Sequence, residues 1–146
     1  MKVFFDTSAL VTAVVDQLPN HGASLECYRR FAQPRRSGSV AVCSTHVIAE
    51  SYAALTALPL ARRIQPAEAA RLIEENFLEH LEVIPLSTAD YKAAIARVAA
   101  LGLRSGAIYD ALHVRCAERA GCDRILTYNT ADFARLAPPG IEVATP

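Results

Sequence analysis

The chain has 146 residues, and its 15 basic and 15 acidic side chains give a formal net charge of zero at pH 7. Hydrophobic residues make up 52% and charged residues 21%, which excludes a disordered chain and fits one domain with a full core. Zero net charge excludes nucleic-acid binding through a global basic field, so phosphate contacts would need local patches. The four cysteines form no Cys-x-x-Cys pair, and neither a signal segment nor an apolar run of transmembrane length is visible. We therefore expect a reduced, cytoplasmic protein.

The first predicted element is a buried strand that ends in a carboxylate. Residues 3–5 are Val-Phe-Phe, strand formers without polar alternation, as expected for a strand covered on both faces. Asp6 follows at the carboxyl end of this strand, where open α/β sheets bind their ligands. Thr7 or Ser8 is expected to cap a helix over residues 9–15.

The rest of the chain predicts strands separated by helical segments. Helices are expected over residues 23–32, 44–58, 66–80, 87–102 and 105–121, and strands over residues 39–43, 81–86, 124–128 and 141–143. This alternation predicts an α/β fold with a mainly parallel sheet of four to five strands and helices on both faces. Without an internal repeat or linker, residues 1–146 are predicted to form a single domain.

Four polar positions depart from this pattern. Glu50 and Asp110 interrupt apolar helix faces that should be buried, and no Lys or Arg lies within one turn on the same face. Asp6 and the Asn129/Asp132 pair follow strands. Burying an unpaired carboxylate costs several kcal/mol, and a shared Mg²⁺ or Mn²⁺ would compensate all of them together. The alternative is that each acid is separately capped, solvated or paired with a distant Arg.

A pocket of carboxylates around divalent cations has the chemistry of a metal-dependent nuclease. The cation lowers the pKa of a bound water and stabilises charge on a phosphodiester. Thr7, Ser8 or Thr127 would orient the water or hold a carboxylate. Arginines form local basic patches that are either solvated surface or a phosphate path: Arg29, Arg30, Arg35, Arg36, Arg62, Arg63 and Arg104.

Taken together and in order, these pieces resemble the PIN-domain family, and within it the VapC-type toxins of bacterial toxin–antitoxin pairs. The resemblance rests on Phe-Phe-Asp6-Thr-Ser-Ala, on Glu50 in the second strand–helix unit, on Tyr-Asp110-Ala-Leu-His, and on Leu-Thr-Tyr-Asn129-Thr-Ala-Asp132-Phe. It covers essentially the whole chain. Each piece alone is a weak signal, and their shared order and spacing make the set specific.

The resemblance implies a three-layer α/β/α fold and an endoribonuclease that depends on Mg²⁺ or Mn²⁺. Its acidic core would be Asp6, Glu50 and Asp110, with a fourth position filled by Asn129 or Asp132, of which Asp132 is the acid. The implied partners are an RNA substrate, often tRNA or rRNA, and a cognate VapB-type antitoxin bound near the site. A homodimer is also implied, extending to a heterotetramer or a larger assembly with the antitoxin.

Other functional classes fit the sequence less well. A haloacid-dehalogenase-type phosphatase needs a second Asp two residues after Asp6, where Ser8 stands, and a receiver domain needs a late Lys that is missing. A zinc site from His113, Cys116 and Cys122 has an unusual spacing and no evident fourth ligand, so His113 is predicted to be a packed imidazole or a neighbour of the site. A housekeeping RNA-processing nuclease and a non-catalytic PIN module that binds RNA or protein remain alternatives.

Overall fold

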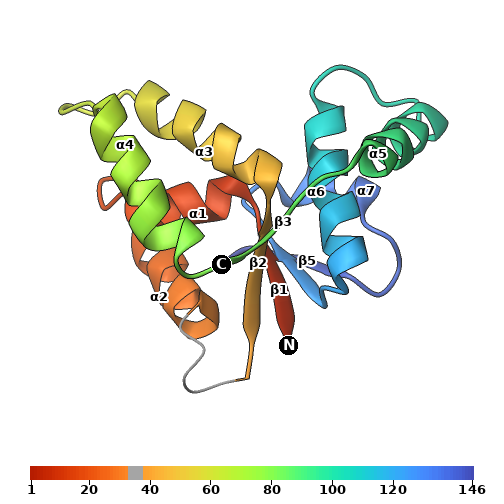
Figure 1. Cartoon of the computed structure of the whole chain (residues 1–146), viewed down its shortest axis with the longest axis horizontal. Coiled ribbons are helices and arrows are strands. Elements are labelled where there is room, and N and C mark those ends of the chain that lie inside the picture. Colours follow the sequence, from red (N-terminus) through yellow and green to blue (C-terminus); the bar gives the residue numbers. More distant parts are fainter. Residues whose placement is uncertain (33–37) are drawn as a thin grey trace.

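The protein is a three-layer α/β/α molecule in a computed structural model that describes residues 1–32 and 38–146. Its core is a five-stranded parallel sheet with the strand order β3-β2-β1-β4-β5. Helices α1 to α4 lie on one side of the sheet and helices α5 to α7 on the other (Figure 1). The predicted α/β fold class is therefore confirmed.

The elements follow one another in a regular alternation. In chain order they are β1 (Lys2–Phe5), α1 (Thr7–Val14), α2 (His21–Ala32), β2 (Val40–Ser44), α3 (Thr45–Ala57), α4 (Pro66–Ile73), the π-helical segment η1 (Glu74–Leu78), β3 (Glu82–Ile84), α5 (Thr88–Ala100), α6 (Ala107–Ala120), β4 (Arg124–Leu126), α7 (Thr130–Leu136) and β5 (Glu142–Ala144).

Strand β1 is the centre of the sheet, and its apolar run explains why. Val3, Phe4 and Phe5 have no exposed surface, because β1 pairs with β2 on one side and with β4 on the other while helices cover both faces. The chain moves outward from β1 to β3 and then returns to β4, so the strand order reverses between β1 and β4. Such a reversal leaves a crevice at the carboxyl ends of the strands, where α/β proteins bind ligands.

Two local predictions differ from the structure. Asp6 itself is the N-cap of α1, which therefore begins at Thr7 and not at residue 9. The expected helix over residues 66–80 is interrupted by η1. There the Asn76 side-chain amide donates a hydrogen bond to the carbonyl of Leu72, and the Tyr28 hydroxyl donates one to the carbonyl of Asn76. Side chains that occupy main-chain acceptors widen the helical turn at this point.

Helix α7 was not predicted, because its seven residues carry too little periodicity to separate a short helix from a loop. Of the arginines proposed as a phosphate path, Arg35 and Arg36 lie outside the described residues. Within the part that is described, no helix is both long and apolar enough to span a bilayer.

Candidate active site

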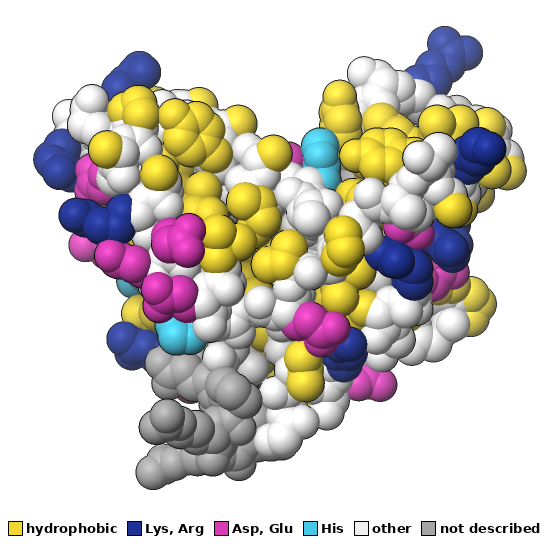
Figure 2. Space-filling view, viewed as in Figure 1, with side chains coloured by type: hydrophobic (Ala, Val, Ile, Leu, Met, Phe, Trp, Pro, Cys, Tyr) yellow, Lys and Arg dark blue, Asp and Glu magenta, His cyan; other side chains and the backbone are white. Residues whose placement is uncertain are grey.

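A cleft separates the two helical lobes at the carboxyl edge of the sheet. Figure 2 shows this notch, with hydrophobic side chains on both walls and a histidine and an acidic side chain between them. Helices α3 and α6 flank the notch (Figure 1), and β1 points into it. The predicted site residues come from these elements and from the segment after β4.

Asp6 is buried and held by one of its two carboxylate oxygens. Its Oδ2 accepts hydrogen bonds from the Ser8 hydroxyl at 2.7 Å, from the Ser8 backbone amide at 3.3 Å and from the Thr127 hydroxyl at 2.8 Å. Its Oδ1 accepts no hydrogen bond from the described residues and faces His113, whose Nε2 is 4.0 Å away. The fold therefore fixes the carboxylate through Oδ2 and leaves Oδ1 available in the cleft.

Glu50 projects from α3 to the same point and is held by Thr7 and two histidines. Its Oε2 accepts from the Thr7 hydroxyl at 2.6 Å and from His113 Nε2 at 3.0 Å, and its Oε1 lies 3.0 Å from His46 Nε2. Burial alone would raise the pKa of Glu50, but the hydrogen bonds and charges of His113, Thr7 and His46 outweigh it and lower the pKa to about 2. Glu50 is thus an anion already held in place by the protein.

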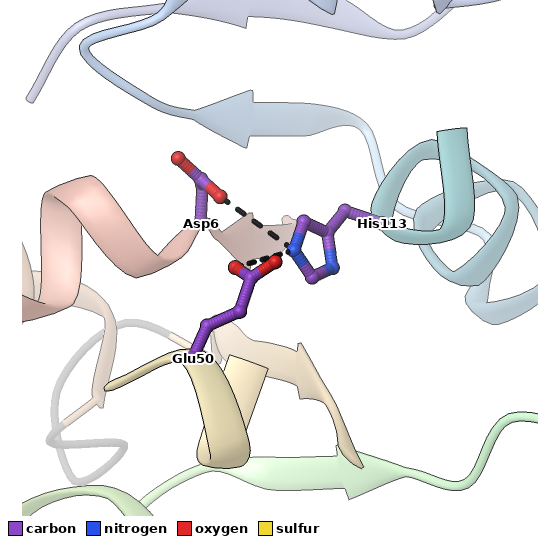
Figure 3. Close-up of side chains that lie close together, drawn as sticks. All are labelled: Asp6, Glu50 and His113. Carbon is purple, nitrogen blue, oxygen red and sulfur yellow. Dashed lines mark hydrogen bonds and ion pairs between the residues drawn. The ribbon is translucent and has the colours of Figure 1, made fainter. Parts of the chain in front are cut away.

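His113 joins the carboxylates from the opposite lobe (Figure 3), and its imidazole is fully buried. Its Nδ1 lies 3.1 Å from the Ser44 hydroxyl, whose oxygen also accepts the Val47 amide as the N-cap of α3. Because the ionised Glu50 carboxylate can only accept, Nε2 carries the proton that His113 donates to Glu50. In this arrangement the Nε2 lone pair is not available to a metal.

Asp110 lies near the start of α6, partly buried and close to other acids. Burial and the charges of Asp6, Asp132 and Glu50 raise its pKa to about 6, against a smaller opposing effect of His113. The amide of Asn129 donates to its Oδ2 at 3.1 Å. A carboxylate in this state gains strongly from a cation placed among its acidic neighbours.

Asp132 lies farther out, in the first turn of α7, and forms an ion pair with Arg135. Asp132 and Asp110 both line a pocket of about 240 Å³ that also includes Arg104. Asn129 and Asp132 therefore have different roles in this structure, because the amide holds Asp110 while the acid is paired with an arginine. Which of them reaches a metal stays a prediction.

The tightest group of metal-ligand atoms differs from the predicted set. Among the described residues, Asp6, Glu50 and His113 are the group of three or more whose ligand atoms lie within 4.8 Å of one another. Asp110 and Asp132 are outside this group. Cys116 and Cys122 are buried and do not belong to it either.

Sequence reasoning missed the two histidines that compensate Glu50. The absence of Lys and Arg from its helix face favours a cation as the partner of Glu50, but in the structure His46 lies one turn before Glu50 and His113 reaches it from α6. The i, i+4 spacing of His46 and Glu50 was a signal that could have been read. The prediction that His113 is packed beside the site agrees with the structure.

The donor set fits a hard divalent cation such as Mg²⁺ or Mn²⁺. Asp6 Oδ1 accepts no hydrogen bond from the residues described here, Glu50 is ionised, and Asp110 is repelled by its acidic neighbours. These groups supply carboxylate oxygens, which such cations prefer. His113 Nε2 carries a proton and so has no lone pair with which to bind the ion. Asp6 and Glu50 are the carboxylates whose oxygens lie close enough together to hold such an ion, and a role for Asp110 stays a prediction.

Comparison with known proteins gives a consistent result. The family model described as PIN domain matches residues 3–138 of the chain. A stretch of 72 residues is 39% identical to Ribonuclease VapC27 of Mycobacterium tuberculosis. This alignment covers 49% of the chain and 50% of that protein, so the chain matches about half the length of this curated relative.

Solved structures with the same fold include Mycobacterium tuberculosis VapC20, described as a sarcin-ricin loop cleaving toxin. It superposes with a TM-score of 0.72 over 90% of this chain and 93% of that chain, at 16% identity. VapBC2 from Rickettsia felis, solved with a DNA fragment from its promoter, gives a TM-score of 0.68 over 99% and 98% of the two chains, at 20% identity. A toxin–antitoxin complex from Klebsiella pneumoniae gives 0.63 over 95% and 94%, at 18% identity.

Proposed function

The chain belongs to the PIN domain family, and we propose that it is a divalent-cation-dependent endoribonuclease that acts as the toxin of a type II toxin–antitoxin pair. The observation that carries the nuclease proposal is the geometry of Asp6. One oxygen is fully occupied by Ser8 and Thr127, while the other is directed to the point where Glu50 and His113 meet. A carboxylate fixed in this way is preorganised to bind a ligand and not to stabilise the fold alone.

The residues of the chain have distinct roles in this proposal. Asp6, Glu50 and Asp110 hold the cation, and a bound Mg²⁺ or Mn²⁺ would activate water and stabilise the charge on the phosphodiester. Thr7 and His113 keep the Glu50 carboxylate in one orientation, and Ser8 and Thr127 do the same for Asp6. Asn129 positions Asp110 through its amide. Asp132, farther out in the first turn of α7, is a further candidate ligand of the cation.

The proposed substrate is RNA, with tRNA or rRNA as the expected class. The relatives support this choice, because one is named a ribonuclease and another is described as cleaving the sarcin-ricin loop. The proposed protein partner is a VapB-type antitoxin, since several structural neighbours were solved as toxin–antitoxin complexes. A homodimer, which binds the antitoxin as a heterotetramer or a larger assembly, belongs to the same proposal, and so does a cytoplasmic location.

The substrate class and the toxin role are tested separately. Purified protein with Mg²⁺ should cut total RNA and leave single-stranded DNA intact, as followed by gel electrophoresis. Equal cutting of DNA would contradict the assignment to RNA. Induced expression of the chain alone should stop growth, and co-expression with its antitoxin should restore it. An active ribonuclease whose expression is harmless would instead be a housekeeping RNA-processing enzyme.

A further inference from the structure

Tyr109 and His46 form a stacked pair beside the carboxylates. Their ring centroids are 5.2 Å apart and their planes differ by 11°, so the two rings lie face to face. Tyr109 belongs to the first turn of α6 and directly precedes Asp110, whereas His46 lies at the start of α3. The pair therefore connects the two walls of the cleft next to the proposed site.

The tyrosine ring is held in a fixed orientation and remains open to solvent. His46 Nε2 is 3.0 Å from Glu50 Oε1, which anchors the imidazole on which Tyr109 stacks. Tyr109 is nevertheless 50% exposed. An aromatic ring needed for the core would be buried, as Tyr28 is with 6% exposure. Half of the residue therefore remains exposed beside the His46 stack, which leaves Tyr109 area for a second stacking partner.

We propose that Tyr109 is a stacking platform for one nucleobase of the RNA, next to the phosphodiester that is cut. This inference rests on the proposed function and names a substrate-positioning subsite within it. Sequence-tolerant stacking on an aromatic side chain is a common way to hold single-stranded nucleic acid, and RNA recognition favours bases that are splayed out of a helix. A ring already fixed by its neighbour loses little conformational entropy when a base stacks on it.

The electrostatics of the cleft explain why such a platform is useful. Asp6, Glu50 and Asp110 repel a phosphate backbone, so charge alone does not attract RNA here until a cation is bound. Stacking on Tyr109 adds affinity that does not depend on charge. Asp110 directly follows Tyr109 in the chain. A base stacked on Tyr109 therefore also places its nucleotide beside the carboxylate that the RNA backbone must approach.

The test is a fluorescence titration with a defined probe. The probe is a single-stranded RNA decamer of uridines with one central 2-aminopurine, whose fluorescence is quenched when its ring stacks. Ca²⁺ is supplied as an oxygen-seeking cation, and the quench is read immediately on mixing. The proteins compared are the wild type, Tyr109→Leu, Tyr109→Phe and the control Tyr91→Leu, which removes another exposed tyrosine (41%) from α5.

The wild type and Tyr109→Phe should quench the probe, and Tyr91→Leu should match the wild type. Tyr109→Leu should bind about 5- to 100-fold more weakly and lose the quench, since stacking on one aromatic ring is worth a factor of this size. Thermal unfolding of each variant confirms that the fold is kept.

Two results would overturn the subsite. One is that Tyr109→Leu binds and quenches like the wild type, and the other is that Tyr91→Leu weakens binding equally. If the wild type neither binds nor quenches the probe, the platform is likewise refuted. Failure of the nuclease proposal gives a different pattern: Tyr109-dependent quenching of the probe, but no cutting of any RNA with Mg²⁺ or Mn²⁺.

Discussion

At the residue scale, the site consists of charges that the protein has already oriented. The predicted acids Asp6 and Glu50 lie together, and short contacts from Ser8, Thr7 and Thr127 fix both. The residues around Glu50 in the sequence do not reveal that the imidazole of His113 reaches its carboxylate from another helix. That contact depends on how α3 and α6 pack across the sheet, which is a property of the tertiary structure.

Asp110→Asn should stabilise the cation-free protein at neutral pH. The Asp110 pKa is raised from 3.8 to about 6, so between these values the folded state binds a proton that the unfolded state has released. Stability therefore falls as pH rises through this window, and above pH 6 the ionised Asp110 destabilises the fold. The neutral amide should add about 1 kcal/mol at pH 7 and almost nothing at pH 4, measured by urea unfolding in EDTA. A variant that is less stable than the wild type at pH 7 would contradict the repulsion, and Asp16→Asn in an exposed loop is the matched control.

His113→Leu should destabilise the protein by about 2–4 kcal/mol, since it leaves Ser44 and Glu50 without the imidazole that joins them. Denaturant unfolding at pH 7 measures this, with His80→Leu at an exposed position as the control that should change by less than about 0.5 kcal/mol. Equal changes in the free energy of unfolding for the two substitutions would show that the Ser44–His113–Glu50 contacts do not stabilise the fold.

At the scale of elements, hydrophobic periodicity and capping residues predict most helices and strands. The structure departs from these predictions where side chains compete with the main chain for hydrogen bonds, as in η1. The helix expected from residue 87 is present as α5, and a capping box between Ser87 and Asp90 fixes its start. The short α7 was not predicted, because it has no periodic apolar pattern of its own, whereas η1 lies inside a predicted helix and differs only in its wider turn. The strand and helix order was predictable from sequence up to α7, and the packing of helices across the sheet was not.

Asp90 ties α5 to α6, and its removal tests how much that connection contributes. The carboxylate is 1% exposed, caps α5 through Ser87, and lies 3.3 Å from Arg115 and 3.2 Å from Arg119. Burial opposes its ionisation, but the Ser87 hydrogen bonds and the two arginines lower its pKa, so its stabilising effect is present at neutral pH and is lost on acidification. Asp90→Ala should cost about 3–5 kcal/mol in urea unfolding at pH 7, against about 1 kcal/mol for Ser87→Ala, which removes the cap alone. Similar losses for the two variants would show that the arginine pairs add nothing.

At the scale of the whole molecule, the strand order places the acids from distant segments at one edge. Asp6 follows the central strand, Glu50 and Asp110 start from helices on opposite faces of the sheet, and Asn129 follows β4. A zero net charge leaves no general attraction for RNA, so affinity for the substrate should depend on the bound cation and on local contacts.

Mn²⁺ should stabilise the folded protein by binding only to the assembled cluster. At a concentration one hundred times its Kd, the gain is about 2.7 kcal/mol, or roughly 6–10 °C in Tm for a chain of this size. Differential scanning fluorimetry should show the shift for the wild type and not for Asp6→Asn. An equal shift in both proteins would place the bound cation elsewhere.

The most direct test of the central claim is RNA cleavage by the purified protein with Mn²⁺, with EDTA, and with Asp6→Asn and Asp16→Asn as paired variants. We predict that the wild type and Asp16→Asn cut RNA with Mn²⁺, that EDTA stops both, and that Asp6→Asn is at least about 100-fold slower, since Asp6 would hold the cation. Cutting that persists in EDTA, or an Asp6→Asn variant as active as the wild type, would contradict a metal-dependent site at the end of β1.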